Sequence, residues 1–303
     1  QYGAYISPIT PGHEFSGEIV ETGAAVKNFK VGDRVTVAPL LPCFKCEFCE
    51  QGHYSLCRDY KYFGSRNDGA FAQYVAVPEP NLLKVADNVT FEAAATTDPL
   101  ANALHAIKRG GFKQGDKVCV FGLGAIGLYC VQYMKAKGAK IAVAVDVDER
   151  KLQVARDCGA DVAIDGRAAD VVDQVIAATE GGADVCIDAS GFPAAQHNAI
   201  EATAKHGTMV LLGISHQPLT LSEKCLDWVM RGEKAIVGSW NSFSKPFPGW
   251  EWTHGVESLA DGTIDAEKVI THKLPLEEVP SVFDKIYKKE LYFNKVLFLP
   301  WME

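Results

Sequence analysis

Six short apolar segments alternate with helix-length segments through the middle of this sequence, and this alternation restricts the fold more than any other feature. The apolar segments are residues 118–121, 141–145, 162–164, 185–187, 209–212 and 236–237. Between them, apolar residues recur at helical spacing, as at Ile126, Cys130 and Met134. Strands that alternate with helices form parallel sheets. The pattern therefore predicts an α/β domain with a doubly wound parallel sheet and helices on both faces.

A glycine-rich loop follows the first of these strands. Residues 122–127 read Gly-Leu-Gly-Ala-Ile-Gly and open a predicted helix. The string alone is a weak signal, but a strand before it and a helix after it are the context that a dinucleotide-binding loop requires. The glycines allow a tight turn, close approach of a pyrophosphate and close helix packing. The sequence predicts cofactor contacts at Gly122, Gly124, Ala125, Ile126 and Gly127.

An acidic residue ends the second strand of this region. Asp146 lies 24 residues after Gly122, near the spacing expected for the acid that binds a ribose 2′-hydroxyl. A carboxylate there repels a 2′-phosphate, so NAD is the predicted cofactor. The alternative is that Asp146 only caps the next helix. Arg150 and Lys151 lie nearby, so NADP stays open, and Lys151 is a further candidate contact to the cofactor.

Four cysteines occur within fifteen residues before this region. Cys43, Cys46, Cys49 and Cys57 have the spacing C-x2-C-x2-C-x7-C. Disulfides are one alternative, but the other five cysteines are scattered singly through apolar segments. An iron–sulfur cluster is another, although its fourth cysteine normally follows after three residues. Four thiolates suit tetrahedral zinc and leave no open position, so the sequence predicts a structural zinc site.

Composition and patterning outside the middle region suggest a second domain. Residues 15–22, 34–38 and 71–77 read as strands bounded by turn residues, and the segment after Gly238 ends in a helix at 276–289 and a strand at 295–299. We expect a β-rich domain at 1–99 and 241–303, with the nucleotide domain inserted at 100–240. The net charge of −8 and the absence of basic runs argue against nucleic acid, and no apolar run is long enough for a membrane span. Cysteine usage suggests a cytoplasmic protein.

A second metal site is suggested by three residues. His13 and Glu14 are adjacent before a predicted strand, and Asp98 lies where the two predicted domains meet. A histidine and carboxylates are ligands of catalytic zinc sites, which keep an open position for substrate. Asp98 has an alternative role as a helix N-cap before Pro99.

These motifs together resemble the zinc-dependent medium-chain dehydrogenases of the alcohol and polyol dehydrogenase superfamily. The matching elements are Gly12-His13-Glu14-Phe15-x-Gly17, Val31-Gly32-Asp33-Arg34-Val35, the four cysteines, Asp98-Pro99-Leu100, the glycine loop and Thr271-His272-Lys273. Segments at 63–69, 238–240 and 246–252 resemble the sorbitol and galactitol-1-phosphate dehydrogenase branch. The resemblance implies a GroES-like catalytic domain around a Rossmann domain, a homodimer or homotetramer, and a small-molecule polyol or polyol phosphate as substrate.

The resemblance also implies ligands for the catalytic zinc. His13 and Glu14 match two of them, and Asp98 stands where the family has a glutamate, whose side chain reaches about 1.5 Å further. The family places a cysteine ligand upstream of the Gly-His-Glu element, whereas the first cysteine here is Cys43. We expect that an N-terminal segment is missing from this sequence, and that its strands would otherwise cover apolar core.

The expected function is zinc-dependent oxidation of a sugar alcohol, or its phosphate, to the ketose by hydride transfer to NAD. Arg66 and Lys245 lie in the segments that resemble the phosphorylated-polyol branch and are candidate phosphate contacts, or else solvated surface charges. One alternative is a zinc-free quinone or enone reductase, which the cysteine cluster argues against. The other is a non-catalytic NAD-binding homologue without a complete catalytic zinc site.

Overall fold

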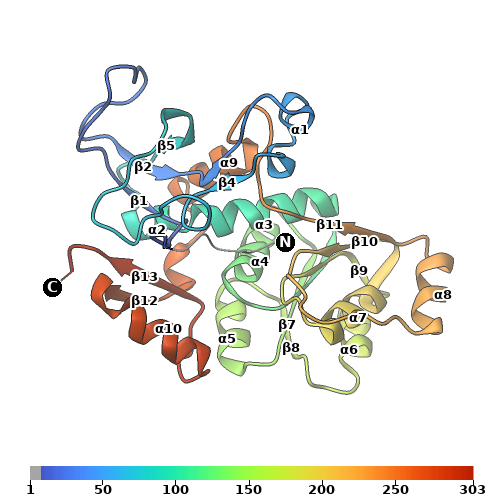
Figure 1. Ribbon diagram of the computed structural model, residues 1–303. Coiled ribbons are helices and arrows are strands. Elements are labelled where there is room, and N and C mark those ends of the chain that lie inside the picture. The colour runs from blue at the N-terminus through green and yellow to red at the C-terminus, as the bar shows by residue number, and fades with distance from the viewer. Residues whose placement is uncertain (1–7, 303) are drawn as a thin grey trace. The chain divides into compact units, whose positions relative to one another are not determined.

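The structure of this protein is a computed structural model that describes residues 8–302 (Figure 1). The chain divides into two compact units. The first unit comprises Gln1–Ala101 and Asn241–Glu303, and the second comprises Asn102–Trp240. The boundary falls within helix α3 (Thr97–Gly110). No helix among the described residues is both long and apolar enough to span a membrane.

The second unit is built on a six-stranded parallel sheet. Its strands, in chain order, are β6 (Lys117–Phe121), β7 (Ile141–Asp146), β8 (Val162–Asp165), β9 (Ala183–Asp188), β10 (Thr203–Leu211) and β11 (Ala235–Gly238). The spatial order is β11-β10-β9-β6-β7-β8. The order reverses between β6 and β9, where Cys119 pairs with Cys186. This topology confirms the predicted doubly wound α/β fold.

Helices cover both faces of this sheet. They are α4 (Ala125–Ala136), α5 (Glu149–Asp157), α6 (Val171–Ala178), α7 (Pro193–Ala202) and α8 (Glu223–Arg231). Figure 1 shows α4 with α5, and α6 with α7, on opposite sides of the strands, and α8 packs on α7. Asp148 and Ser222 cap α5 and α8 by accepting backbone N–H groups, which satisfies donors that the first helical turn leaves free. An apolar cluster that includes Val171, Val175 and Ile200 fills the core between α6, α7 and the sheet.

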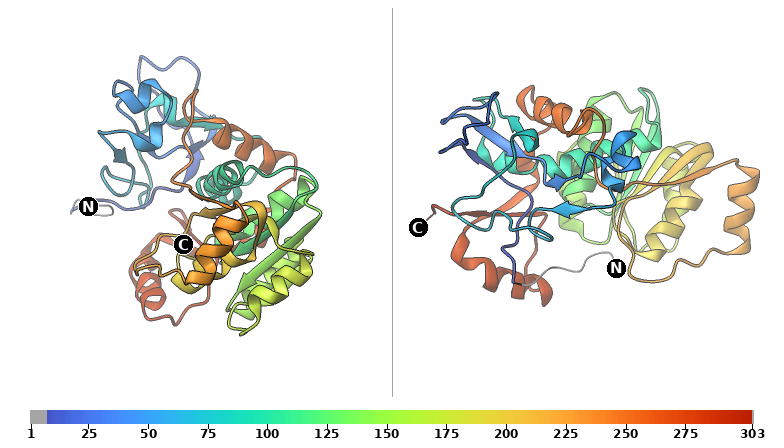
Figure 2. Two further views of the ribbon diagram at one scale, coloured as in Figure 1. Left: turned by 90° about the vertical axis from the view of Figure 1, so that its right-hand side faces the viewer. Right: turned by 45° about the horizontal axis from the view of Figure 1, so that its top comes forward.

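The first unit is β-rich. It holds an antiparallel sheet in the order β1 (Ser16–Glu18), β2 (Arg34–Val37), β5 (Leu82–Lys84), an antiparallel pair of β3 (Leu40–Leu41) and β4 (Lys61–Tyr62), and a parallel pair of β12 (Ile270–Pro275) and β13 (Lys295–Leu299). Its helices are α1 (Glu47–Glu50), α2 (Phe91–Ala95), α9 (Trp250–Ala260) and α10 (Val279–Tyr287). Short 3-10 turns occupy Tyr54–Leu56, Glu79–Asn81, Ala266–Lys268 and Leu276–Glu278. Figure 2 shows these elements in two further views.

The core of the first unit joins both of its chain segments. Leu40, Tyr62 and Trp252 are buried together, and the ring of Phe243 stacks on Trp252 with 5.5 Å between centroids. Aromatic pairs of this kind stabilise the core beyond the area that they bury. The C-terminal segment is therefore an integral part of the first unit.

One predicted strand is absent. Residues 71–77 have strand-type sequence, yet the structure assigns them no strand and leaves Tyr74 65% exposed. A strand needs a neighbour that accepts and donates backbone hydrogen bonds. Within residues 8–302, no strand pairs with residues 71–77. The alternating sequence of this segment is therefore not sufficient to form a strand. The strand predicted at 15–22 is likewise limited to Ser16–Glu18, where β2 pairs with it.

Candidate functional site

The four predicted zinc-binding cysteines converge in the first unit. Cys46 precedes α1, Cys49 lies within it, and Cys57 follows the turn Tyr54–Leu56. The four sulfur atoms lie within 4.8 Å of one another, and the backbone N–H of Cys43 points at the Cys57 sulfur, 3.3 Å away. All nine cysteines fall in the described part of the chain, and all are free thiols. This geometry fits a closed four-thiolate zinc site.

The pKa values of the four thiols indicate that the cluster is stabilised by a bound cation. Backbone N–H groups of Arg58 and Cys49 lower the pKa of Cys46 to about 6, whereas burial raises the pKa of Cys49 to about 12. Burial also raises the pKa of Cys57. Four adjacent thiolates repel one another, and a bound dication reverses this balance by deprotonating its ligands.

His13, Glu14 and Asp98 also converge, as the sequence predicts. One ligand atom of each lies within 4.8 Å of the others. The His13 Nε2 atom is 3.8 Å from Glu14 Oε1 and 4.0 Å from Asp98 Oδ2. Asp98 lies in the first turn of α3 and is buried, whereas His13 and Glu14 precede β1. The three side chains offer one nitrogen and two carboxylates, a donor set that suits zinc with an open position.

The imidazole in this group is neutral at physiological pH. Burial, followed by the charge of Lys295, lowers the pKa of His13 to about 4. His13 therefore contacts the carboxylates of Glu14 and Asp98 as a neutral ring and does not form ion pairs with them. A neutral imidazole has a free nitrogen lone pair, which a metal ligand needs.

Lys295 on β13 is a partner of this site that the sequence analysis did not predict. Its Nζ atom donates a hydrogen bond to Glu14 Oε2, while Oε1 of the same carboxylate faces His13. Burial lowers the pKa of Lys295 to about 7, and the carboxylate against it favours the charged ammonium. A lysine 281 residues away in sequence gives no local motif, so only the fold reveals this contact.

Tyr62 on β4 is a second partner that sequence reasoning missed. Its hydroxyl donates to Asp98 Oδ1 over 3.3 Å, and its ring packs edge-on against His13 with 5.5 Å between ring centroids. Burial and the charge of Asp98 raise the pKa of Tyr62 well above its usual value, so the hydroxyl stays a donor. Tyr62 thus orients one candidate ligand and limits the position of another.

A large groove in the first unit opens onto His13, Glu14 and Lys295. Its volume is about 2250 Å³, and its walls come mainly from apolar residues of β2, β13, α10 and residues 70–77. Small-molecule sites typically measure 300–1,000 Å³ with a few polar groups among apolar walls. The groove has that character but is larger than one polyol requires.

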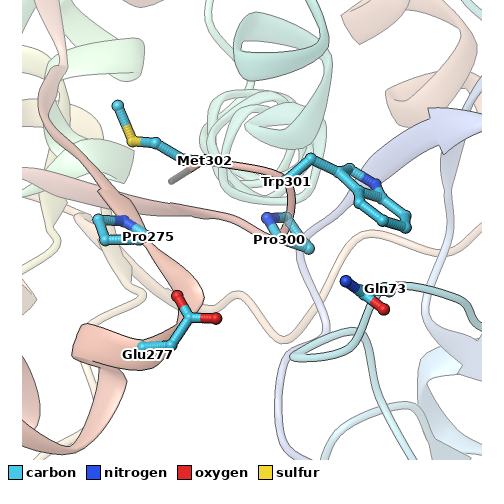
Figure 3. A pocket seen from close by; sticks show the side chains of 6 residues that line it. All are labelled: Gln73, Pro275, Glu277, Pro300, Trp301 and Met302. Carbon is cyan, nitrogen blue, oxygen red and sulfur yellow. The ribbon is translucent and has the colours of Figure 1, made fainter.

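A smaller hollow of about 460 Å³ lies at the end of the chain (Figure 3). It is lined by Gln73, Pro275, Glu277, Pro300, Trp301 and Met302. One carboxylate and one amide among its lining residues do not form a metal-binding or catalytic group. We therefore assign it no role in the chemistry.

The glycine loop has the geometry that a phosphate-binding turn requires. Gly122 has φ +90°, and a Cβ there would lie 2.7 Å from the backbone nitrogen of Ser190. A Cβ at Gly127 would overlap the Gly122 carbonyl oxygen, whereas one at Gly124 would meet no described atom within 4 Å. Gly124 is the N-cap of α4, so open space lies at a helix N-terminus, where Ala125 and Ile126 begin the first turn. This arrangement fits an anionic pyrophosphate.

Asp146 ends β7 beside this loop. Its Oδ2 accepts the backbone N–H of Leu123 over 2.7 Å, and Oδ1 accepts that of Asp148 over 3.0 Å. Asp148, and not Asp146, is the N-cap of α5. Each Asp146 oxygen keeps a second lone pair that a ribose hydroxyl could use.

The structure places the remaining candidates as follows. Lys151 lies in the first turn of α5, next to Arg150, whose guanidinium is engaged by Asp148 at 2.6 Å. Arg66 is half-buried in the turn after β4, where its charge acts on Tyr60. Lys245 is exposed, and the aliphatic part of its side chain lies against Gly52, which is between Cys49 and Cys57 in the sequence.

Comparisons with known proteins agree with this geometry. The family described as "Alcohol dehydrogenase GroES-like domain" matches residues 1–87, and "Zinc-binding dehydrogenase" matches residues 125–253. A galactitol 1-phosphate 5-dehydrogenase of Escherichia coli is 33% identical over 300 residues, covering 98% of this chain and 86% of that protein. A sorbitol dehydrogenase of Halalkalibacterium halodurans is 35% identical over 297 residues, covering 97% and 84%. The crystal structure of galactitol-1-phosphate dehydrogenase from Escherichia coli is similar with a TM-score of 0.90 at 32% identity, over 98% of this chain and 86% of that one.

Proposed function

This chain belongs to the zinc-dependent medium-chain dehydrogenases, in the branch of galactitol-1-phosphate and sorbitol dehydrogenases, and on this basis we propose that it oxidises a sugar alcohol or sugar-alcohol phosphate to the ketose with NAD. The reaction converts an alcohol and NAD⁺ to a ketone, NADH and a proton. The observation that carries the proposal is the convergence of His13, Glu14 and Asp98 within 4.8 Å, with His13 and Glu14 lining a groove that admits a small molecule.

These three side chains would hold the catalytic zinc. Zinc, when bound, supplies a Lewis acid that polarises a substrate hydroxyl. His13 presents a neutral nitrogen, and Lys295 and Tyr62 fix the carboxylates of Glu14 and Asp98. The four cysteines would hold a second, structural zinc, whose full set of ligands excludes substrate.

The glycine loop and Asp146 would hold the nicotinamide cofactor, which accepts the hydride. The amide groups at the start of α4 would face the pyrophosphate, and Asp146 would accept hydrogen bonds from the ribose. We infer NAD because Asp146 carries a negative charge there and because Asp148 already engages Arg150. Lys151 follows Arg150 in α5 and is a candidate contact to a 2′-phosphate.

Arg66 is our candidate for recognition of a substrate phosphate. Its guanidinium is half-buried, and a planar fork of donors suits a phosphate better than a single hydroxyl. Lys245 is exposed and is the weaker candidate. Arg66→Ala should lower kcat/KM for the phosphorylated polyol by about tenfold more than for the free polyol. An equal loss on both substrates would remove Arg66 from phosphate recognition.

The direct test is an assay of zinc-loaded protein on a panel of polyols and their phosphates with NAD and NADP. We expect turnover that His13→Ala and Asp98→Asn reduce by at least about a hundredfold, because each removes a ligand. Asp87→Asn, an exposed change outside the groove, is the matched control and should leave the rate unchanged. Asp146→Asn keeps an acceptor for Leu123 and should lower the preference for NAD over NADP about tenfold.

A non-catalytic NAD-binding homologue is the second candidate. The His13 Nε2 atom lies 3.8 and 4.0 Å from carboxylate oxygens of Glu14 and Asp98, so these atoms must move closer together to hold zinc. Metal analysis separates the two functions. A zinc ion that the wild type binds and His13→Ala lacks, together with turnover, supports the dehydrogenase, whereas equal zinc contents in the two proteins, with cofactor binding and no turnover, support the non-catalytic alternative.

A further inference from the structure

Another group of metal-ligating side chains lies in the second unit. His197 and Glu201 are on α7, and Cys225 is on α8, which packs against α7 (Figure 1). One ligand atom of each lies within 4.8 Å of the others. We propose that His197, Glu201 and Cys225 form a binding site for a divalent transition-metal ion, with zinc as the preferred occupant. The site is separate from the four cysteines and from the His13 group.

Helix geometry brings two of these ligands together. His197 and Glu201 are four residues apart, so they lie one turn apart on the same face of α7. Residues at this spacing on a helix are the arrangement that helical zinc motifs use. Both side chains are half-buried, which holds them near the protein surface while leaving room for rotation.

The third ligand comes from the first turn of α8. Ser222 caps this helix by accepting the Cys225 N–H over 3.1 Å. The start of a helix stabilises negative charge, so a Cys225 thiolate is favoured there once a cation is present. Burial among Ala199, Ile200 and neighbouring apolar residues raises the pKa of this thiol in the metal-free protein. Metal binding would therefore release the thiol proton to solvent as the metal–sulfur bond forms.

The set of donor atoms selects the metal. A thiolate, an imidazole and a carboxylate are common zinc ligands, whereas magnesium and calcium take oxygen ligands. Ligand atoms around tetrahedral zinc lie roughly 3.5 Å apart, so ligand atoms that already lie within 4.8 Å of one another need only a small side-chain adjustment to hold the ion. Three protein ligands leave the fourth position to water.

Lys234 is the charged neighbour that limits the affinity. Its Nζ donates to the carbonyl oxygens of Ile200 and Glu201, at 3.1 and 3.2 Å, at the end of α7. Its charge acts on both Cys225 and Glu201. Once the thiol proton is released, the thiolate, the carboxylate and this ammonium give the site a net charge of −1. We therefore expect weaker binding than at the four cysteines, and tighter binding once Lys234 is neutralised.

Cobalt(II) added to the full chain carrying one equivalent of zinc, which the four cysteines bind most tightly, gives a specific readout. Cobalt bound to a thiolate has a charge-transfer absorption, and the His13 group contains no thiol. We expect this absorption in the wild-type protein and in His13→Ala, and its loss in Cys225→Ser. His197→Gln and Glu201→Gln should weaken cobalt binding at least about tenfold, and Lys234→Met should strengthen it about threefold or more.

His206→Gln, which changes an exposed histidine on β10, is the matched control and should bind cobalt like the wild type. Retention of the full absorption in Cys225→Ser would show that cobalt has entered the four-cysteine cluster, and would overturn the proposal. Binding by His197→Gln and Glu201→Gln within twofold of His206→Gln would also overturn it. These two half-buried substitutions keep the test valid if Cys225→Ser fails to fold.

Discussion

The ammonium group of Lys295 lies against the carboxylate of Glu14, and both side chains are largely shielded from water, with 15% and 23% exposed. Glu14 precedes β1 and Lys295 begins β13, so the contact joins the two chain segments of the first unit. A shielded carboxylate needs a partner, and its removal leaves a costly unpaired charge. Lys295 thus positions a candidate zinc ligand and also supports the fold.

Lys295→Met should lower the free energy of unfolding by about 1–3 kcal/mol, because Glu14 loses its donor. In Glu14→Gln/Lys295→Met the loss should be smaller than the sum of the two single changes. Urea denaturation of the four proteins gives the coupling energy. Lys273→Met, which breaks a more exposed pair with Glu267, is the control and should cost no more than about 1 kcal/mol. Additive losses would show that Lys295 and Glu14 do not interact.

Tyr62→Phe should weaken zinc binding at the His13 site about fivefold, because Asp98 loses one hydrogen bond worth about 1 kcal/mol. Zinc titration against a competing chelator measures this change. Tyr74→Phe removes a hydroxyl from a side chain that is 65% exposed and should leave the affinity unchanged. Equal affinities in all three proteins would remove Tyr62 from the site.

The glycine loop allows a test that separates folding from cofactor binding. Gly124→Ala adds a methyl group into open space at φ −70°, so the unfolding free energy should change by less than about 0.5 kcal/mol. The same methyl group should obstruct the pyrophosphate and raise the Kd for NADH about tenfold or more. Gly127→Ala should impair both properties, because its Cβ overlaps the Gly122 carbonyl. Fluorescence titration with NADH and thermal unfolding distinguish the two variants.

His13 makes stability depend on pH in a defined direction. Its pKa is about 4 in the folded metal-free chain and about 6.5 in the unfolded chain, so the unfolded state binds more protons between these values. The metal-free protein should therefore lose stability, relative to His13→Ala, as pH falls from 6.5 to 4. The ring is 41% exposed, so solvent screening should limit the difference to about 1 kcal/mol. Urea denaturation at pH 7 and at pH 4.5 measures the free energy of unfolding of both proteins. An equal difference between wild type and His13→Ala at the two pH values would contradict the prediction.

Removal of zinc from the four cysteines should increase backbone mobility only in the segment that they hold together, residues 43–58. The helical turns at Glu47–Glu50 and Tyr54–Leu56 are too short to be stable alone, and the sulfur cluster ties them together. Cys46→Ser should lower the zinc content by one ion per chain and speed amide exchange at residues 43–58. Exchange within β6 and β9 should stay slow. Unchanged exchange at residues 43–58 would show that the lobe folds without metal.

The six-stranded sheet could be predicted from sequence because its signal is local. Each strand of the second unit before β11 contains an apolar run and is followed by a helix, and the glycine loop identifies the first turn. The strand predicted at 71–77 was wrong because strand formation depends on a partner, which a sequence pattern does not contain. Phe71 and Val75 have suitable side chains, yet no described strand pairs with them.

The candidate metal sites also combine residues that a local sequence pattern predicts with residues that only the fold brings together. Cys43, Cys46 and Cys49 are close in sequence, so their spacing predicted a cluster. Lys295 and Tyr62 reach the His13 site from β13 and β4, and neither belongs to a recognisable spacing. Their roles depend on long-range packing, which burial and hydrogen bonding reveal only in the folded chain.

The two hydrogen bonds of Asp146 have an evolutionary consequence. The carboxylate that would discriminate between the two dinucleotides also anchors the N–H of Leu123 in the turn beneath them. A lineage that exchanged Asp146 for a small neutral residue would gain tolerance for a phosphorylated ribose but loosen the turn that binds both cofactors. A switch in cofactor preference would therefore need a compensating substitution nearby, so this position constrains the order in which such changes can accumulate.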